Sequence, residues 1–371
     1  MSMRIMHSPK SVDIDITSKC NLRCAYCGHF TSAGDVDTDL PADEWLTFFE
    51  ELGSAAVTAV TLCGGEPFIR ADLQELLAGI VKNRMRFNIL SNGTLITDEI
   101  ASYIASTRRC NSVQVSIDGS GPSSHDACRG EGSFLLAVNG LKTLQKHGIP
   151  AAVRVTIHKQ NVYDLADIAR LLLVDVGLPS FSTNVASFFG QCRENDAQLR
   201  LTTPERSYAM DVLTRLNREY NGRITACAGP LAVARAWREM EKARSEGRES
   251  LPGRGMLRAC GGVLSKLAVR ADGVMTPCIQ MSHIELGRIN EVSLQEVWKE
   301  HPELMSLRQR RDIPLGDFAF CDGCEYIPYC TGNCPALAYT ITGRENHPSP
   351  DACLRVFLQD GGILPMEHYD A

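Results

Sequence analysis

Three cysteines near the amino terminus have the spacing of an iron–sulfur ligand set. Cys20, Cys24 and Cys27 follow an apolar run that ends at Ile16, where a first strand is expected to open into a loop. Three thiolates can hold three irons of a [4Fe-4S] cube and leave the fourth iron without a protein ligand. A small molecule can then bind that iron, so the spacing indicates catalysis as well as electron storage. The pair Cys24 and Cys27 alone would also fit a zinc knuckle.

A glycine-rich motif follows the next apolar run of the chain. This motif is Gly64-Gly65-Glu66-Pro67, and an aromatic residue, Tyr26, stands immediately before the third cysteine. Together with the cysteine loop, these features resemble the radical S-adenosylmethionine (SAM) superfamily, which has a CxxxCxΦC loop and a GGEP motif. The resemblance implies that SAM chelates the open iron and is cleaved to a 5′-deoxyadenosyl radical, which removes a hydrogen atom from a substrate.

Length and composition limit the class of protein. The 371 residues, 44% of them apolar, are enough for one large α/β domain and a smaller one. A net charge of -6 without a long basic run argues against nucleic acid as a main partner. No stretch reaches the roughly 18 apolar residues of a membrane helix, so no membrane partner is expected. The fifteen cysteines fit metal binding in a reducing cytoplasm, where we expect the protein to be located.

Short β-branched runs alternate with longer amphipathic stretches from Ser11 to about Gly190, which is the pattern of βα units around a parallel sheet. Six strands are predicted, at residues 12–17, 57–62, 87–90, 113–117, 151–157 and 181–186. The predicted helices span residues 42–52, 73–83, 98–106, 134–147, 165–176 and 204–220. These repeats form an incomplete, TIM-like (β/α)6 barrel.

The chain divides into four predicted segments. A short amino-terminal segment, 1–11, precedes the barrel, 12–220. Residues 235–258 are rich in charge and end near Pro252-Gly253, so 221–258 is interpreted as a solvated helix and a linker. A small cysteine-rich domain then covers 259–371.

The carboxyl ends of the strands are the expected place of the active site in a parallel barrel. Gly64 and Gly65 lack side chains, so backbone carbonyls can approach the SAM ammonium group, and Glu66 adds a hydrogen-bond acceptor. A plain Gly-Gly turn is the alternative interpretation. Ser91 and Asn92 end the third strand. At the end of the fourth strand, the hydroxyl of Ser116 and the carboxylate of Asp118 could bond the ribose or organise the cavity. The residues assigned to SAM in this way are Gly64, Gly65, Glu66, Pro67, Ser91, Asn92 and Ser116.

Two arginines are candidates for the SAM carboxylate. Arg129, in His125-Asp126-Ala127-Cys128-Arg129, matches the family position for this contact, and its forked guanidinium suits a carboxylate. Arg154, in the middle of the fifth strand, is the second candidate. A salt bridge at the barrel rim would explain Arg154 equally well.

Asp118, Cys63 and Cys128 are the candidate catalytic residues. Asp118 ends the fourth strand, where an ordinary Asp-Gly turn is the alternative explanation. Cys63 precedes the glycine motif and Cys128 precedes Arg129, so either thiol could return a hydrogen atom to a substrate radical. Both could equally be small buried packing residues.

A second cysteine set lies in the carboxy-terminal part, with the spacing Gly-x4-Cys and Cys-x2-Cys-x5-Cys-x3-Cys. Its members are Cys260, Cys278, Cys321, Cys324, Cys330, Cys334 and Cys353. The set resembles the SPASM domain, which binds two auxiliary [4Fe-4S] clusters, so three clusters are expected in all. A zinc ribbon is the alternative for the thiolate pairs.

The resemblance implies a ligand assignment for the two auxiliary clusters. It gives Cys321, Cys324, Cys330 and Cys353 to a distal cluster. Cys260, Cys278 and Cys334 would hold the cluster nearer the barrel, which we call the inner auxiliary cluster. Its fourth iron is either open, with a substrate cysteine as a possible ligand, or closed by a further residue such as Cys227.

SPASM proteins mostly modify peptides or proteins, so the primary expectation is maturation of a ribosomally made peptide by crosslinking, thioether formation or epimerisation. The expected partners are the peptide, a reductant such as flavodoxin or ferredoxin, and a separate leader-peptide-binding protein if leader recognition is needed. Formylglycine formation in sulfatases is an alternative, but Ile279 stands where those enzymes carry an aspartate after Cys278. A small-molecule or tetrapyrrole substrate is a further alternative, and a non-enzymatic iron–sulfur scaffold is disfavoured.

Overall fold

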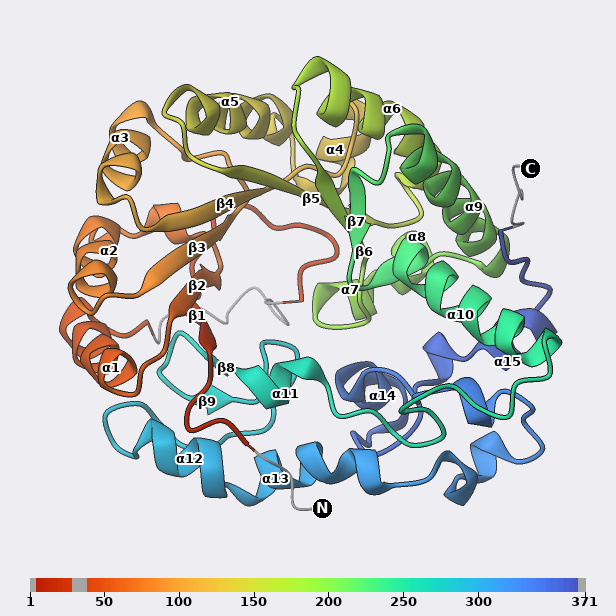
Figure 1. Cartoon of the computed structure of the whole chain (residues 1–371). Coiled ribbons are helices and arrows are strands. Elements are labelled where there is room, and N and C mark those ends of the chain that lie inside the picture. The colour runs from red at the N-terminus through yellow and green to blue at the C-terminus, as the bar shows by residue number, and fades with distance from the viewer. Residues whose placement is uncertain (1–4, 29–38, 366–371) are drawn as a thin grey trace.

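The computed structural model describes residues 5–28 and 39–365 and contains a partial barrel with a smaller cysteine-rich part along its open side (Figure 1). The strands are β1 (Ser11–Thr17), β2 (Ala59–Gly64), β3 (Arg86–Ser91), β4 (Cys110–Ser116), β5 (Ala151–Ile157), β6 (Phe181–Val185), β7 (Ile224–Ala226), β8 (Lys266–Val269) and β9 (Met275–Thr276). The barrel helices are α1 (Ala42–Ser54), α2 (Leu73–Lys82), α3 (Asp98–Thr107), α4 (Pro122–Arg129), α5 (Ser133–Lys146), α6 (Leu165–Arg170), α7 (Gln191–Glu194), α8 (Asp196–Leu199), α9 (Thr203–Glu219) and α10 (Gly229–Ser245). The remaining helices are α11 (Gly261–Ser265), α12 (Leu294–Glu300), α13 (Pro302–Gln309), α14 (Pro335–Thr342) and α15 (Leu354–Gln359).

The described strands form one sheet in the order β7-β6-β5-β4-β3-β2-β1-β8-β9. Strands β1 to β7 are parallel and lie side by side in chain order, with helices on their outer face (Figure 1). The predicted partial barrel is therefore confirmed, and its six strands appear within three residues of the expected bounds. The short strand β7 was not predicted.

Strand β1 shows why these residues form a barrel strand. Val12, Ile14 and Ile16 are fully buried and alternate with partly exposed polar residues, because successive side chains of a strand point to opposite faces. The apolar face belongs to a core shared with Trp45 and Phe48 of α1. Burying one such aliphatic side chain contributes roughly 1.5–3 kcal/mol. The opposite face leaves polar side chains for the interior of the barrel.

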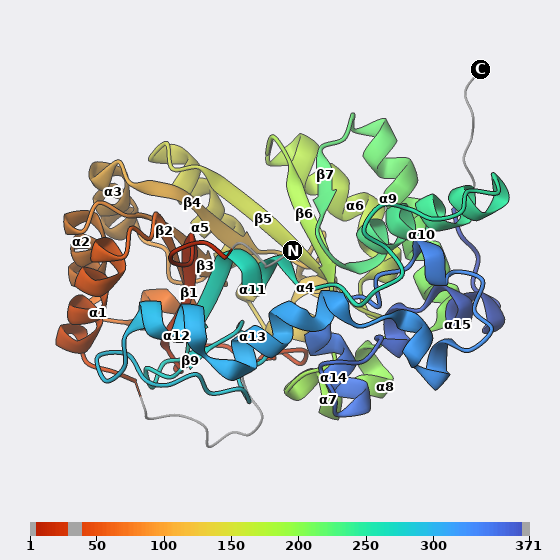
Figure 2. The ribbon, with the colours of Figure 1, turned by 60° about the horizontal axis from the view of Figure 1, so that its bottom comes forward.

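Helix α10 connects the barrel with the cysteine-rich part. It contacts β6, β7 and α9, and in both Figure 1 and Figure 2 it lies beside α15. Its buried face carries Trp237 and Met240, which belong to one cluster with Phe357 of α15. The rings of Trp237 and Phe357 have centroids 4.8 Å apart. The charged stretch expected to form a solvated helix therefore has an apolar face that joins two parts of the molecule.

The cysteine-rich part also extends the barrel sheet. Strand β8 pairs in parallel with β1, with Ser11 opposite Lys266, and β9 pairs antiparallel with β8. Helices α12 and α13 run along the same side (Figure 2). The sheet is continuous across the predicted boundaries at 220/221 and 258/259, and the domain bounds proposed from the sequence stay predictions.

None of the helices in the described part of the chain is long and apolar enough to cross a membrane.

Candidate active site at the carboxyl end of the barrel

The cysteine loop begins where β1 ends and is held there by Asp39. Thr17 Oγ1 donates to Asp39 Oδ2 at 2.5 Å, while the backbone nitrogen and the hydroxyl of Ser18 both donate to Oδ1 at 2.7 Å. Burial acts to raise the pKa of Asp39, but these hydrogen bonds hold it below its ordinary value. The backbone just before Cys20 is thereby fixed to the end of the first strand.

Cys20, Cys24 and Cys27 line one cavity of about 360 Å³ at this end of the sheet. Burial raises the pKa of the Cys20 thiol and raises that of Cys24 to about 11, and negative charge on Cys27 would raise both further. Deprotonating all three thiols is thus unfavourable when no metal is bound. The cationic iron–sulfur core makes the thiolate form favourable, because metal coordination deprotonates a thiol. The donor set fits an iron–sulfur cluster.

A single zinc ion does not fit the described cysteines. A zinc site brings its thiolates to about 2.3 Å from one point. Within residues 5–28 and 39–365, no three His, Cys, Asp or Glu side chains are grouped closely enough to hold one metal ion. This spacing does not support the zinc alternatives for either cysteine set.

The two motif glycines allow the loop after β2 to lie against the loop after β1. Gly65 N donates to Thr17 O at 2.8 Å, and Glu66 N donates to Lys19 O at 2.8 Å. A Cβ on Gly64, whose φ is +111°, would lie 2.3 Å from Thr17 O, and a Cβ on Gly65 would lie 2.0 Å from Lys19 O. Both glycines also line the cavity. They therefore position the cysteine loop in addition to opening the site.

Glu66 is fully buried and joins β2 to β3. Its Oε1 accepts from Ser91 Oγ at 2.8 Å, and its Oε2 accepts from the backbone nitrogen of Asn92 at 2.7 Å. Burial raises the pKa of Glu66 to about 7. Asn92 in turn places its amide nitrogen 3.9 Å from Cys20 Sγ. Glu66 thus orients Ser91 and Asn92, which line the cavity while Glu66 itself does not.

Arg129 is held by Asp118 beside the cysteine loop. Arg129 Nε lies 2.5 Å from Asp118 Oδ2, and Tyr26 donates its hydroxyl to the same oxygen. Thr156 N donates to Asp118 Oδ1 at 2.7 Å. Burial acts to raise the pKa of Asp118, but Arg129 holds it below its ordinary value. Arg129 Nη1 lies 3.9 Å from Cys24 Sγ, so this guanidinium reaches the cluster loop.

The sequence-predicted residues do not all face the cavity. Those that line it are Cys20, Cys24, Cys27, Cys63, Gly64, Gly65, Ser91, Asn92, Ser116 and Arg129. Glu66, Pro67, Asp118 and Cys128 lie behind its wall. Cys128 packs instead in a small buried cluster with Cys192 and Leu199. Cys63 is therefore the one of the two catalytic thiol candidates that reaches this cavity.

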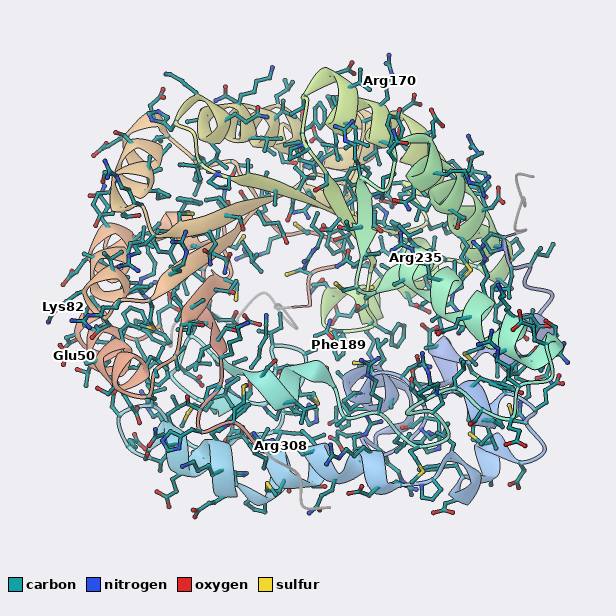
Figure 3. All side chains as sticks on the ribbon, viewed as in Figure 1. Glu50, Lys82, Arg170, Phe189, Arg235 and Arg308 are labelled. Atoms are coloured by element: carbon teal, nitrogen blue, oxygen red, sulfur yellow. The ribbon has the colours of Figure 1, made fainter. Side chains whose placement is uncertain are left out.

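Sequence reasoning missed several cavity residues. Asp15 points into the barrel from β1, and the alternation of the strand was the signal that could have shown it. Asn184, near the end of β6, carries a buried Oδ1 without a hydrogen-bond partner among the described residues. The cysteine-rich part contributes Gln280, two residues after Cys278. Phe189 adds an aromatic side chain to the cavity wall and lies toward the middle of the molecule in Figure 3.

A second cavity of about 310 Å³ adjoins the first. Four residues line both cavities, namely Asn184, Val185, Ser187 and Gln280. The second cavity has apolar walls from Met210 and Leu337, and Arg154, Cys227 and Cys334 also line it. It therefore extends from the first cavity toward the second cysteine set.

The four cysteines assigned to the distal cluster line one apolar hollow in the cysteine-rich part. They are Cys321, Cys324, Cys330 and Cys353. Burial raises the pKa of Cys321 to about 11, and negative charge on Cys330 would raise it further. The donor set is closed by protein residues and fits a cube with four thiolate ligands.

The three cysteines assigned to the inner auxiliary cluster also lie close together. Burial raises the pKa of Cys278 to about 12, and charges on Cys334 and Cys260 would raise it further. Cys227, the candidate fourth ligand, is exposed and lines the second cavity together with Cys334. Whether Cys227 binds the fourth iron of the inner auxiliary cluster therefore decides whether that iron is open to the second cavity.

Comparison with known proteins agrees with this architecture. Residues 14–172 match the radical SAM superfamily, and residues 260–334 match the iron–sulfur cluster-binding SPASM domain. The chain is therefore a radical SAM enzyme with a SPASM domain. These domains imply a SAM-binding [4Fe-4S] cluster and auxiliary clusters. A crystal structure of SuiB from Streptococcus suis bound to SAM has a similar fold, with a TM-score of 0.71 and 16% identity over 94% of this chain and 78% of that chain.

Relatives with three different named activities match along most of this chain. The Fe-coproporphyrin III synthase of Methanosarcina barkeri is 29% identical, over 89% of this chain and 84% of the relative. The AdoMet-dependent heme synthase of the same organism is 26% identical, over 91% of this chain and 94% of the relative. The pre-heme d1 synthase of Dinoroseobacter shibae is 28% identical, over 91% and 84%.

These relatives correct the expected substrate. The prediction of peptide maturation is wrong, because the relatives that match over nearly the whole chain are named as synthases of tetrapyrroles. The mycofactocin maturase MftC of Mycolicibacterium smegmatis is 33% identical but matches only 45% of this chain and 43% of its own length. The seven-cysteine pattern indicated the clusters but did not distinguish a peptide from a macrocycle.

Proposed function

We propose that this chain acts on a carboxylate-bearing tetrapyrrole and removes a hydrogen atom from a peripheral side chain of the macrocycle. The observation that carries the proposal is the match of three tetrapyrrole synthases along about nine-tenths of the chain. The two adjoining cavities support it, because they offer separate places for SAM and for a second molecule.

We assign Cys20, Cys24 and Cys27 to the cluster that binds SAM. When bound, this cluster and SAM supply the 5′-deoxyadenosyl radical. That chemistry would consume one external electron per SAM and release methionine as the second product. It replaces a substrate C–H bond by a C–H bond of 5′-deoxyadenosine and leaves a carbon-centred radical on the substrate. Arg129 would bind the SAM carboxylate, while Asp118 is a positioning residue that holds Arg129 and Tyr26.

Arg154 is the residue we assign to a substrate carboxylate. It lies in the middle of β5, and its exposed side chain lines the second cavity. Its Nε donates a hydrogen bond to Ser182 Oγ at 3.4 Å. No ion pair to Arg154 is formed within the described residues. By contrast, Arg206 in the same cavity is paired with Asp351 at 3.0 Å. Arg154 thus offers a guanidinium fork to an anionic side chain of a macrocycle whose faces meet the apolar walls.

The experiment that tests the function is substrate-dependent SAM cleavage. Anaerobically reconstituted protein is mixed with dithionite, SAM and iron coproporphyrin III, and 5′-deoxyadenosine and the mass of the macrocycle are measured. We expect the tetrapyrrole to stimulate 5′-deoxyadenosine release and to change in mass. Cys24→Ala is the control and should release none. Stimulation by a cysteinyl peptide, with the tetrapyrrole unchanged, would overturn the proposal.

A further inference from the structure

Two fully buried arginines lie two residues apart near the end of α13. Arg308 and Arg310 are each 0% exposed. A buried guanidinium is costly unless its charge and its donors are matched. Within the described residues, neither arginine forms an ion pair with a carboxylate, so the charge of each needs another explanation.

Arg308 is explained by the core of the cysteine-rich part. Its Nε donates to Val263 O at 2.9 Å and its Nη1 donates to Trp298 O at 2.6 Å. Its guanidinium also lies over the Trp298 ring, 4.2 Å from the centroid. Figure 3 shows Arg308 between α11 and α13. Arg308 therefore joins α11, α12 and α13. Its Nη2 is also buried without a hydrogen-bond partner among the described residues, but no cysteine charge acts on its guanidinium.

Arg310 has a different environment. Its Nη1 donates to Arg258 O at 2.6 Å and its Nη2 donates to His347 O at 3.3 Å. Its Nε is buried and has no hydrogen-bond partner among the described residues. The negative charges that favour its protonated form are, in order, those of Cys334, Cys260 and Glu345. The first two are cysteines of the inner auxiliary cluster.

The charge on Arg310 persists despite its burial. Arginine stays protonated in proteins, so the guanidinium is charged at neutral pH. Its Nη1 is bound to the carbonyl of Arg258, two residues before Cys260. A [4Fe-4S] core with thiolate ligands carries negative charge, which increases by one unit when the cluster is reduced. Hydrogen bonds to the sulfurs and local charge are two factors that set the potential of such a cluster. A buried cation acts strongly here, since little water screens it.

We infer that Arg310 donates its free Nε–H to a sulfur of the inner auxiliary cluster and that its charge stabilises the reduced form of that cluster. Arg310 is thus a positioning and tuning residue for the cluster that adjoins the second cavity. The inference rests on the SPASM clusters and is independent of the substrate proposed above. Failure of one therefore leaves the other standing.

A redox titration followed by electron paramagnetic resonance tests the charge effect. The signal of the inner cluster is identified in the reconstituted protein as the one lost in Cys278→Ala. At the potential where half of this cluster is reduced, we expect Arg310→Gln to lower the ratio of reduced to oxidised cluster about tenfold, equivalent to about 59 mV for one electron. Arg310→Lys should lower it less, because the charge remains. Arg308→Lys is the matched control and should leave the ratio unchanged.

Isotope labelling tests the hydrogen bond in the unsubstituted protein. With ¹⁵N-labelled arginine, pulsed electron paramagnetic resonance should detect a nitrogen coupling to the reduced inner cluster, and Arg310→Lys should remove it. This measurement does not depend on whether Arg310→Gln folds. Absence of the coupling, or equal potential shifts in the inner and distal clusters, would overturn the inference.

Discussion

The guanidinium of Arg129 is bound to the carboxylate of Asp118, with Nε and Oδ2 2.5 Å apart and both side chains buried. The pair joins the end of α4 to the end of β4 and brings Arg129 to the wall of the cavity that Cys20, Cys24 and Cys27 line. Since a lone arginine side chain has many rotamers, Asp118 is what fixes the direction of the guanidinium.

Replacing Asp118 by Asn should weaken SAM binding and destabilise the fold. Removing one partner of a buried ion pair costs about 3–5 kcal/mol, because the other charge stays buried and unpaired. We expect SAM affinity, measured by equilibrium dialysis, to fall at least about tenfold, which corresponds to about 1.4 kcal/mol. Asp98→Asn, which breaks an exposed contact with Lys146, is the control and should change neither quantity. Unchanged SAM affinity in Asp118→Asn would remove the positioning role.

Replacing Gly65 by Ala should displace the cysteine loop. The added Cβ would meet the Lys19 carbonyl carbon and oxygen, so the backbone between β1 and Cys20 must shift. Such overpacking costs about 1–3 kcal/mol. We expect iron analysis to show a loss equivalent to one cluster of three, with SAM cleavage abolished. Gly316→Ala, where no atom lies within 4 Å of the added Cβ, should keep all its iron.

Replacing Arg154 should affect the tetrapyrrole and spare SAM. A hydrogen bond to a charged group contributes about 1.5–3 kcal/mol, so Arg154→Gln should weaken tetrapyrrole binding roughly 10- to 100-fold. Absorbance titration measures this affinity, and Arg154→Lys should be affected less. Arg235, which lies on α10 in Figure 3 and lines a different hollow, provides the matched control Arg235→Gln. Equal loss of SAM affinity in Arg154→Gln would return Arg154 to the SAM site.

His125 should make the apoprotein sensitive to acid. Burial, followed by the charge of Arg129, lowers its pKa to about 4, and its neutral Nδ1 accepts from Asp118 N at 3.1 Å. Because the pKa is lower in the folded state than in the unfolded state, the stabilisation is present above about pH 6.5 and is lost as the pH falls toward 4. The contribution changes by about 1.4 kcal/mol per pH unit in this window.

The variant His125→Asn keeps an acceptor for Asp118 N but does not titrate. Urea midpoints between pH 4.5 and 7 should therefore fall less steeply for His125→Asn than for the parent protein. Parallel curves for the two proteins would exclude His125 as a source of the acid sensitivity.

The barrel could be predicted from sequence because its strands are locally encoded. The buried face of β1, with Val12, Ile14 and Ile16, is visible as an alternation. Strand β7 has only three residues and gives no periodic signal. The pairing of β8 with β1 joins Lys266 to Ser11, and no local pattern reports a contact across that distance in sequence.

The sequence predicted which residues belong to the site, but it did not predict which of their side chains point into the cavity. The cysteine and glycine motifs identified the loops, yet Glu66 and Asp118 prove to be buried anchors that orient their neighbours. Whether a polar side chain at a strand end enters the cavity or turns behind its wall depends on tertiary hydrogen bonds such as those of Ser91 and Thr156. Arg154 faces a second cavity that exists only because the cysteine-rich part closes over the barrel.

The most direct test of the proposed function is transfer of deuterium from substrate to 5′-deoxyadenosine. Iron coproporphyrin III with deuterated peripheral side chains is incubated anaerobically with the reconstituted protein, dithionite and SAM, and the nucleoside is analysed by mass spectrometry. We predict one deuterium in 5′-deoxyadenosine, accompanied by an altered macrocycle. Unlabelled 5′-deoxyadenosine and an unchanged macrocycle would contradict the assignment of a tetrapyrrole substrate.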